Sequence, residues 1–196
     1  MRNETNMMRG VDWQGEPVAG MYASRKLNGV AMLWDGTDGW TRSGKLITLP
    51  AHIRSTLPAT PLDCELISGK GGNADFNAAS VAVRLNRWTP DIHAVCFDAP
   101  QAPGDWLQRI EFARTHGADC VSLTICESHK DLLWIFNRIT EQDGEGVMLR
   151  TPGIRYRAGR SEDLQKVKWS HHICELMEFE PYAANAYAAN AQEESL

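Results

Sequence analysis

A short apolar run followed by two closely spaced turn signals is the feature that most constrains how this chain can fold. Val30 to Trp34 has the length and composition of a buried β-strand. Asp35-Gly36 and Asp38-Gly39 follow at once, and both dipeptides are typical of the tight turns that join antiparallel strands. We therefore expect residues 22–44 to form a β-hairpin unit.

A lysine stands just before this strand, in the sequence Lys26-Leu27-Asn28-Gly29. Gly29 suits a tight turn beside a ligand, because it has no side chain to restrict the backbone. A lysine attacks a substrate only after it has lost its proton, and burial or a neighbouring cation favours that loss. From this stretch alone, an ordinary surface lysine on a hairpin is the better interpretation of Lys26.

The rest of the chain alternates between strand patterns and helix patterns. Short apolar or alternating runs predict strands at residues 62–67, 92–97, 121–126, 146–149 and 164–169. Helices are predicted at residues 74–88, at residues 105–115 and immediately after Ser128. Asp131 stands three residues beyond Ser128, which is the spacing of a helix-capping box.

The composition indicates one ordinary globular domain. The chain has 196 residues, of which 43% are hydrophobic and 23% are charged. Residues 1–17 are polar and carry two glycines and a proline, so we expect a loosely attached N-terminal extension in which Trp13 can pack onto the domain. Residues 18–178 form the expected domain. Residues 179–196 contain one five-residue sequence twice and are expected to be a low-complexity tail.

The same composition bears on where the protein works. No apolar run approaches the length needed to cross a membrane, and the polar start does not have the pattern of a secretory signal. The five cysteines include no Cys-x-x-Cys pair. An odd number of cysteines without such pairing predicts reduced thiols in a cytoplasmic protein. The lack of a membrane-spanning run predicts no membrane partner.

Charge is distributed unevenly along the chain. The net charge of −5 argues against a protein that coats nucleic acid non-specifically. Residues 150–168 nevertheless carry a net charge of +4, whereas residues 170–196 contain no lysine or arginine. A local basic groove is therefore compatible with the acidic total.

Four further motifs follow Lys26 in a fixed order. They are Asp63-Cys64-Glu65-Leu66, Val95-Cys96-Phe97-Asp98, Glu145-Gly146-Val147-Met148-Leu149-Arg150 and Gln165-Lys166-Val167-Lys168. With these five motifs the chain resembles the covalent nucleotidyltransferases, which include ATP-dependent DNA ligases, RNA ligases and mRNA capping enzymes. Their order and spacing are most similar to those of small bacterial and phage ATP-dependent DNA ligases, over residues 18–178. The resemblance implies an α+β fold, ATP-grasp-like, with antiparallel β-sheets and flanking helices around a nucleotide-binding groove.

The resemblance also implies roles for individual residues. Lys26 would attack the α-phosphate of ATP, and the resulting lysyl-AMP would pass its AMP to the 5′-phosphate of a nick before the 3′-hydroxyl displaces it. The implied catalytic residues are Lys26, Asn28, Glu65, Glu145, Lys166 and Lys168. The implied nucleotide-binding residues are Ser24, Arg25, Lys26, Arg42, Glu65, Phe97, Glu145, Lys166 and Lys168. Glu65 and Glu145 would hold Mg²⁺ or Mn²⁺, and Phe97 would stack on adenine.

Three residues depart from the family pattern. Asn28 replaces an acid, Ala31 stands where DNA ligases carry an arginine, and Cys64 replaces a glycine. Only 28 residues follow Lys168, too few for the OB-fold domain of ligases, so a partner protein supplying that domain or a clamp is one expectation.

The expected substrate is nicked double-stranded DNA. Two alternatives stay open from the sequence. One is an RNA ligase or a capping-type enzyme. The other is a pseudoenzyme that binds nucleotides or nucleic-acid ends without sealing them.

Overall fold

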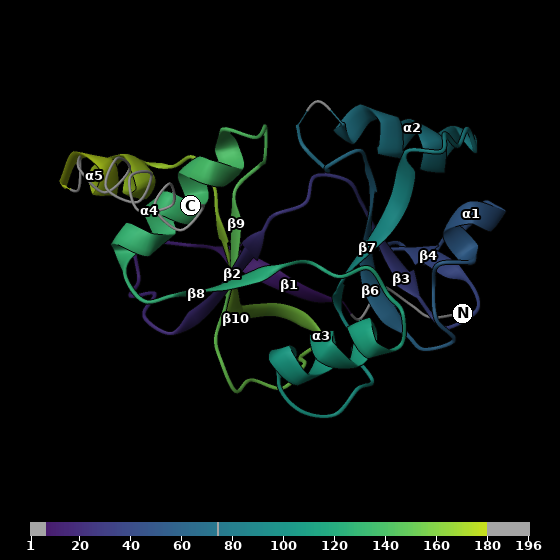
Figure 1. Cartoon of the computed structure of the whole chain (residues 1–196), viewed down its shortest axis with the longest axis horizontal. Helices are drawn as coiled ribbons and strands as arrows, with labels where there is room; N and C mark the ends of the chain where they lie inside the picture. Colours follow the sequence, from purple (N-terminus) through teal and green to yellow (C-terminus); the bar gives the residue numbers. More distant parts are fainter. Residues whose placement is uncertain (1–6, 74, 180–196) are drawn as a thin grey trace, which may run out of the picture.

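The computed structural model describes residues 7–73 and 75–179, which form two five-stranded sheets side by side (Figure 1). The first sheet has the order β1 (Met8–Asp12), β10 (Gly159–Val167), β9 (Val147–Arg150), β2 (Met21–Arg25) and β8 (Leu123–Cys126). The second has the order β5 (Leu46–Ile47), β4 (Gly39–Thr41), β3 (Val30–Trp34), β6 (Leu62–Ser68) and β7 (Ile92–Asp98). The helices are α1 (Ala51–Arg54), α2 (Phe76–Leu85), α3 (Trp106–Thr115), α4 (His129–Thr140) and α5 (His171–Phe179).

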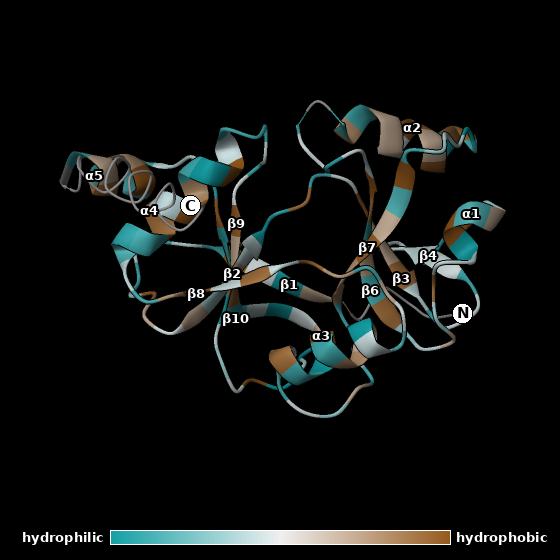
Figure 2. Ribbon diagram, in the orientation of Figure 1, coloured by the Kyte–Doolittle hydropathy of each residue, from teal (hydrophilic) through white to brown (hydrophobic). Residues whose placement is uncertain are grey.

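Each sheet has its own hydrophobic core, so the molecule consists of two lobes (Figure 2). The first lobe is the first sheet with α4 and α5, whose buried residues include Phe136 and Ile173. The second lobe is the second sheet with α1, α2 and α3, represented in its core by Ile53, Ala82 and Ile110.

The predicted hairpin is confirmed, and one carboxylate explains its turn. β3 covers the predicted residues and pairs antiparallel with β4, which brings Trp34 opposite Gly39. The Asp35 carboxylate accepts hydrogen bonds from the backbone N–H groups of Thr37 and Asp38, at 2.9 and 2.8 Å, and from the Trp40 indole at 2.8 Å. The acid of this Asp-Gly pair therefore fixes the turn itself.

The helix predictions are confirmed within a few residues at their ends. Ser128 is the N-cap of α4, where its hydroxyl oxygen accepts a hydrogen bond from the Asp131 backbone N–H. α3 begins with a complete capping box between Asp105 and Gln108. An α+β fold with largely antiparallel sheets is likewise confirmed, since β1 and β10 are the only parallel strand pair in the sheets of the described residues.

The expectation of a loosely attached N-terminal extension is wrong for the part of it that the structure describes. β1 lies within residues 1–17 and forms the edge strand of the first sheet, in parallel register with β10. Trp13, the residue of this segment expected to pack onto the domain, is 3% exposed. A parallel pairing between segments about 150 residues apart leaves no local sequence signal, because neither strand is joined to the other by a turn.

The C-terminal region adds α5, which the sequence patterns do not predict. The low-complexity tail predicted from residue 179 lies, apart from Phe179, outside the described residues. All five cysteines are free thiols. Across residues 7–73 and 75–179, no helix has the length and apolar character required to span a bilayer.

Candidate active site

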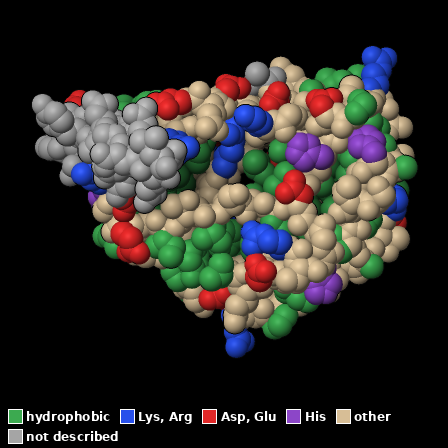
Figure 3. All heavy atoms as spheres, viewed as in Figure 1, with side chains coloured by type: hydrophobic (Ala, Val, Ile, Leu, Met, Phe, Trp, Pro, Cys, Tyr) green, Lys and Arg blue, Asp and Glu red, His purple; other side chains and the backbone are tan. Residues whose placement is uncertain are grey.

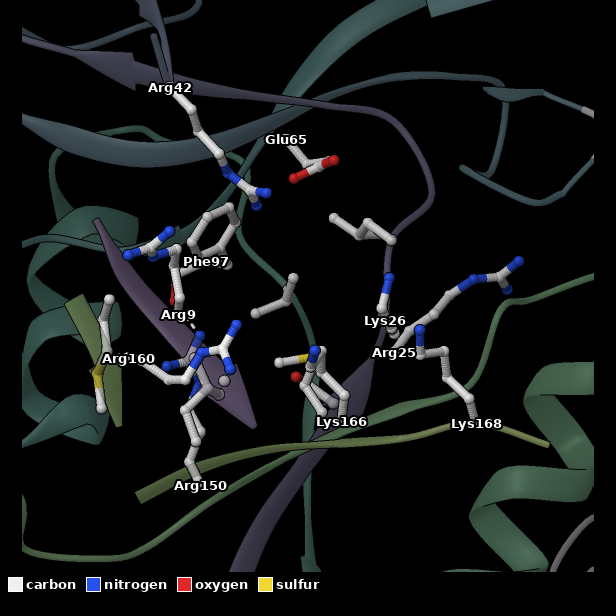
Figure 4. Close-up of a pocket in the computed structure, with 17 residues that line it drawn as sticks. Arg9, Arg25, Lys26, Arg42, Glu65, Phe97, Arg150, Arg160, Lys166 and Lys168 are labelled. Carbon is white, nitrogen blue, oxygen red and sulfur yellow. Dashed lines mark hydrogen bonds between the residues drawn. The ribbon is translucent and has the colours of Figure 1, made fainter. Parts of the chain in front are cut away.

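A cavity of about 430 Å³ lies between the two sheets and collects most of the predicted site residues (Figure 4). Eight of its lining residues are basic: Arg9, Arg25, Lys26, Arg42, Arg150, Arg160, Lys166 and Lys168. Glu65 is the only acidic residue that lines it. The surface is also visibly hollowed between the lobes, with basic side chains beside the hollow (Figure 3). Such an excess of positive charge suits a polyphosphate ligand.

The β2–β9 ladder fixes the position of Lys26. Arg25 pairs with Val147 in that ladder, and the Lys26 backbone N–H donates to the carbonyl oxygen of Gly146 at 2.8 Å. The Lys26 ammonium group then forms an ion pair with Glu145, which stands immediately before Gly146. Both side chains are mostly buried, with 19% and 23% exposed. Lys26 is therefore held on the first sheet by main chain and side chain together.

A glycine is required where Glu145 meets Lys26. Gly146 has a φ of +147°, and a Cβ atom there would lie 2.1 Å from the carbonyl oxygen of Val167. Only glycine allows β9 to begin this close to the end of β10. The glutamate is thereby brought between Lys26, which follows β2, and Lys168, which follows β10.

The two predicted lysines of the last motif both line the cavity beside Lys26 (Figure 4). Lys166 forms an ion pair with Asp12 at 3.0 Å, and Lys168 lies 3.8 Å from the Glu145 carboxylate. The hydrogen bond from Lys166 lowers the pKa of Asp12. Lys166 is therefore bound to a strand that the sequence motifs do not include.

The second lobe supplies the opposite wall of the cavity. Arg42 comes from the turn after β4, Glu65 from β6 and Phe97 from β7, and all three line the cavity. Burial raises the pKa of Glu65 to about 7, although the nearby Arg42 and Lys26 act in the opposite direction. The Phe97 ring gives this wall a flat apolar surface on which a purine could stack.

The remaining predicted residues divide into two groups. Ser24 and Arg25, for which the resemblance implies nucleotide binding, line the cavity. Asn28 does not line it; its side-chain amide donates to Asn73 at 2.9 Å and its backbone N–H to the Gly71 carbonyl oxygen. This arrangement suits a residue that orders the linker after Lys26.

Three of the basic residues that line the cavity are not among the predicted site residues: Arg9, Arg150 and Arg160. Arg150 ends the motif that begins at Glu145, so its position in that motif was an available signal. Arg9 and Arg160 are Cα partners across the parallel β1–β10 pair. Their pairing depends on long-range topology, and nothing in the local sequence indicates it.

Glu65 lines the cavity, and Glu145 does not line it but is paired with Lys26, which does; together these two carboxylates fit a hard divalent cation. Glu65 and Glu145 supply oxygen ligands, the kind that Mg²⁺ and Mn²⁺ prefer. Among the residues that the structure describes, no group of three or more His, Cys, Asp or Glu could hold a metal ion. Mg²⁺ commonly binds through one or two carboxylates together with substrate phosphates and water, which agrees with this donor set.

Comparisons with known proteins point to one group. The chain is 24% identical, over 163 residues, to a curated DNA ligase of Haemophilus influenzae; the match covers 80% of this chain and 60% of that protein. The chain thus spans well under two thirds of this relative. No protein-family model matches the chain.

Solved structures agree with this result. A structure from a study of DNA binding by Lig E DNA ligases is 25% identical, with a TM-score of 0.70, and the match covers 84% of this chain and 69% of that one. The Chlorella virus DNA ligase-adenylate is 19% identical, with a TM-score of 0.67 and coverage of 84% and 67%. The ATP-dependent DNA ligase of bacteriophage T7 in complex with ATP is 16% identical, with a TM-score of 0.61 and coverage of 83% and 68%. The last two identities establish similarity of fold.

Proposed function

Because the chain has the adenylation-domain fold of the ATP-dependent DNA ligases, within the covalent nucleotidyltransferases, we propose that it is an ATP-dependent DNA ligase that seals nicks through a lysyl-AMP intermediate. The observation that carries this proposal is the position of Lys26. Its ammonium group lies in a cavity rich in basic side chains and is paired with Glu145, and a phenylalanine lines the facing wall. A nucleophile, a phosphate-binding wall and a base-stacking ring are the parts that nucleotidyl transfer requires.

In the first step, the Lys26 amine attacks the α-phosphate of ATP. The new P–N bond forms as the bond to the bridging oxygen breaks, and pyrophosphate leaves with the electron pair of that bond. Glu145 is in direct contact with the Lys26 ammonium, so it is the residue placed to accept its proton. Lys166 and Lys168 lie beside the nucleophile and would neutralise the charge on the phosphates.

The second lobe would orient the nucleotide. Phe97 supplies the stacking surface, and Arg42 offers a forked guanidinium to phosphate oxygens. Glu65 faces the same space and can accept a hydrogen bond from a ribose hydroxyl. A divalent cation held by Glu65 and Glu145 would supply charge neutralisation to the phosphates.

In the later steps, the AMP passes from Lys26 to the 5′-phosphate of a DNA nick. The 3′-hydroxyl then attacks that phosphorus and AMP leaves. We place the phosphates of nicked double-stranded DNA beside the basic side chains that line the cavity.

A sealing assay tests the proposal and separates it from the alternatives. Wild-type protein is given a nicked DNA duplex or a nicked RNA substrate, with ATP or GTP and with Mg²⁺ or Mn²⁺. We expect sealed DNA with ATP only, no sealing by Lys26→Ala, and full sealing by the control Lys45→Ala, which changes an exposed hairpin lysine.

Two other outcomes would contradict the proposal. Preference for RNA ends, or for GTP, would identify an RNA ligase or a capping-type enzyme. Binding of nicked DNA without sealing under any of these conditions would identify a non-catalytic binding protein.

A further inference from the structure

The backbone carbonyl of Phe97 accepts two side-chain hydrogen bonds, one from each lobe. The indole N–H of Trp106 on α3 donates at 2.8 Å, and the Nη2 atom of Arg150 on β9 donates at 3.2 Å. Both donors are buried, with 2% and 5% exposed. The Phe97 ring lines the cavity, so these two bonds, together with the pairing of β7 with β6, hold the backbone that carries the ring.

The Arg150 guanidinium is itself held in place by two neighbours: the Trp106 ring against its plane and the Asp98 carboxylate beside one of its nitrogen atoms. The centre of its guanidinium group lies 4.6 Å from the centre of the Trp106 ring, and its Nη1 atom lies 3.6 Å from the Asp98 carboxylate. That carboxylate also accepts two hydrogen bonds from Arg109, at 2.7 and 3.2 Å. A buried, multiply bound guanidinium of this kind has little freedom to turn.

Strand β9, which carries Arg150, also fixes the position of Lys26, the proposed nucleophile. Tyr22 pairs with Arg150 and Arg25 with Val147 in the same antiparallel ladder, and the Lys26 backbone bonds to Gly146 at its end. The distance from Arg150 to Lys26 along this ladder is therefore set by regular backbone pairing. The bond from Arg150 to Phe97 extends that fixed distance across to the second lobe.

We propose that Arg150 and Trp106 are positioning residues that hold the Phe97 ring at a set offset from Lys26, so that a purine nucleotide stacked on the ring presents its α-phosphate to the lysine. The inference rests on the proposed function for the identity of the nucleotide. Arg150 lines the cavity, but its Nη1 and Nη2 atoms are directed at Asp98 and Phe97. It therefore acts on the nucleotide through the phenylalanine.

The test uses Trp106→Phe, which removes the indole N–H but keeps an aromatic face for Arg150. The matched control is Trp134→Phe, because Trp134 carries a similar arginine, Arg138, at 4.9 Å from its ring centre but lies on α4 away from Phe97. The probe is α,β-methylene ATP with Mg²⁺, measured by calorimetry, since this analogue cannot transfer its nucleotide. We expect Trp106→Phe to weaken binding about fivefold, the effect of one hydrogen bond. We expect Trp134→Phe to leave binding unchanged.

A double-mutant cycle with Phe97→Ala separates positioning from general destabilisation. If Trp106 acts through the ring, Trp106→Phe should weaken binding less than twofold once the ring is absent, because the effects of coupled residues are not additive. An equal loss in both backgrounds would overturn the proposal. Arg150→Lys, which keeps a charge near Asp98 but loses the forked geometry, is the second variant and should behave in the same way.

The proposed function and the positioning role of Arg150 and Trp106 are contradicted by different results. Absence of Lys26 adenylation in the wild-type protein would contradict the proposed function. The cycle on analogue binding would still decide whether Arg150 and Trp106 position the ring.

Discussion

At the scale of single residues, a buried carboxylate lies behind the cavity wall. It is Asp63, which belongs to the same sequence motif as Glu65. Asp63 is 1% exposed and accepts a hydrogen bond from the Tyr156 hydroxyl at 2.6 Å. Burial raises the pKa of Asp63 to about 7, even though the bond from Tyr156 and the charges of Arg150 and Arg109 act in the opposite direction. Burial also raises the pKa of the Tyr156 hydroxyl, which keeps it a donor. Asp63 therefore supports the site from the protein interior and does not line the cavity.

Stability should accordingly depend on pH through Asp63. Its pKa is higher in the folded protein than in the unfolded chain, so between about pH 4 and pH 7 the folded state retains a proton that the unfolded state loses. The free energy of unfolding should fall as the pH rises through this window, by at most about 1.4 kcal/mol per pH unit for one group. Denaturant titrations at several pH values should show that the unfolding free energy of Asp63→Asn depends less steeply on pH than that of wild type. Glu65 still titrates in this variant, so the slope should not vanish.

The exposed carboxylate Glu162 provides the control for this measurement. Glu162→Gln should keep the wild-type slope. An unchanged slope in Asp63→Asn would show that this carboxylate does not titrate in the window.

At the scale of elements, β1 is the strand on which the site depends most unexpectedly. It contributes Arg9 to the cavity and Asp12 to the ion pair with Lys166. Gly10 at its centre lies against β10, where an added Cβ atom would come within 2.7 Å of the Leu164 carbonyl oxygen. The close approach of β1 to β10 therefore requires a glycine at this position.

Gly10→Ala tests whether β1 belongs to the functional sheet. The extra methyl group must push β1 away from β10, which we expect to cost about 1–3 kcal/mol of unfolding free energy, as overpacking typically does. Adenylation should also slow, because Lys166 loses the strand that carries its partner. Thermal melting and the rate of AMP attachment measure the two effects. The control Gln14→Ala removes an exposed side chain just beyond β1, with its hydrogen bond to the Asp12 carbonyl oxygen, but leaves the Asp12 carboxylate in place; it should have much smaller effects than Gly10→Ala. Wild-type values in Gly10→Ala would mean that β1 is dispensable.

Local sequence patterns account for the elements and motifs but not for their assembly. The β3 strand and the Ser128 cap are specified by residues close in the chain, so both could be predicted. The network of Asp98, Arg109 and Arg150 could not be, because charged residues are usually exposed and only the fold brings these three together in the interior. The pairing of β1 with β10 could not be predicted either, because only the fold brings these two distant segments together.

At the scale of the whole molecule, positive charge is divided between the cavity and the loop before β10. Arg155 and Arg157 belong to the basic segment 150–168 but do not line the cavity. Arg157 lies 3.8 Å from Asp163, and both arginines are exposed. This arrangement leaves them available to DNA phosphates outside the nucleotide site.

We expect the double variant Arg155→Ala/Arg157→Ala to bind nicked DNA more weakly while Lys26 adenylation stays near wild type. With about three or four phosphate contacts in total, wild-type affinity should fall on the order of a hundredfold between about 50 and 200 mM salt. The double variant should show a shallower salt dependence in a fluorescence-anisotropy titration. Loss of adenylation with unchanged DNA binding would contradict this division of the basic surface.

The central claim is that Lys26 becomes covalently attached to AMP. The most direct measurement is the intact mass of the protein after incubation with ATP and Mg²⁺, followed by peptide mapping of the modified residue. We predict the gain of one AMP, located on Lys26, present in Lys45→Ala and absent in Lys26→Ala. An unmodified wild-type protein, or equal AMP attachment to wild type and Lys26→Ala, would contradict the account.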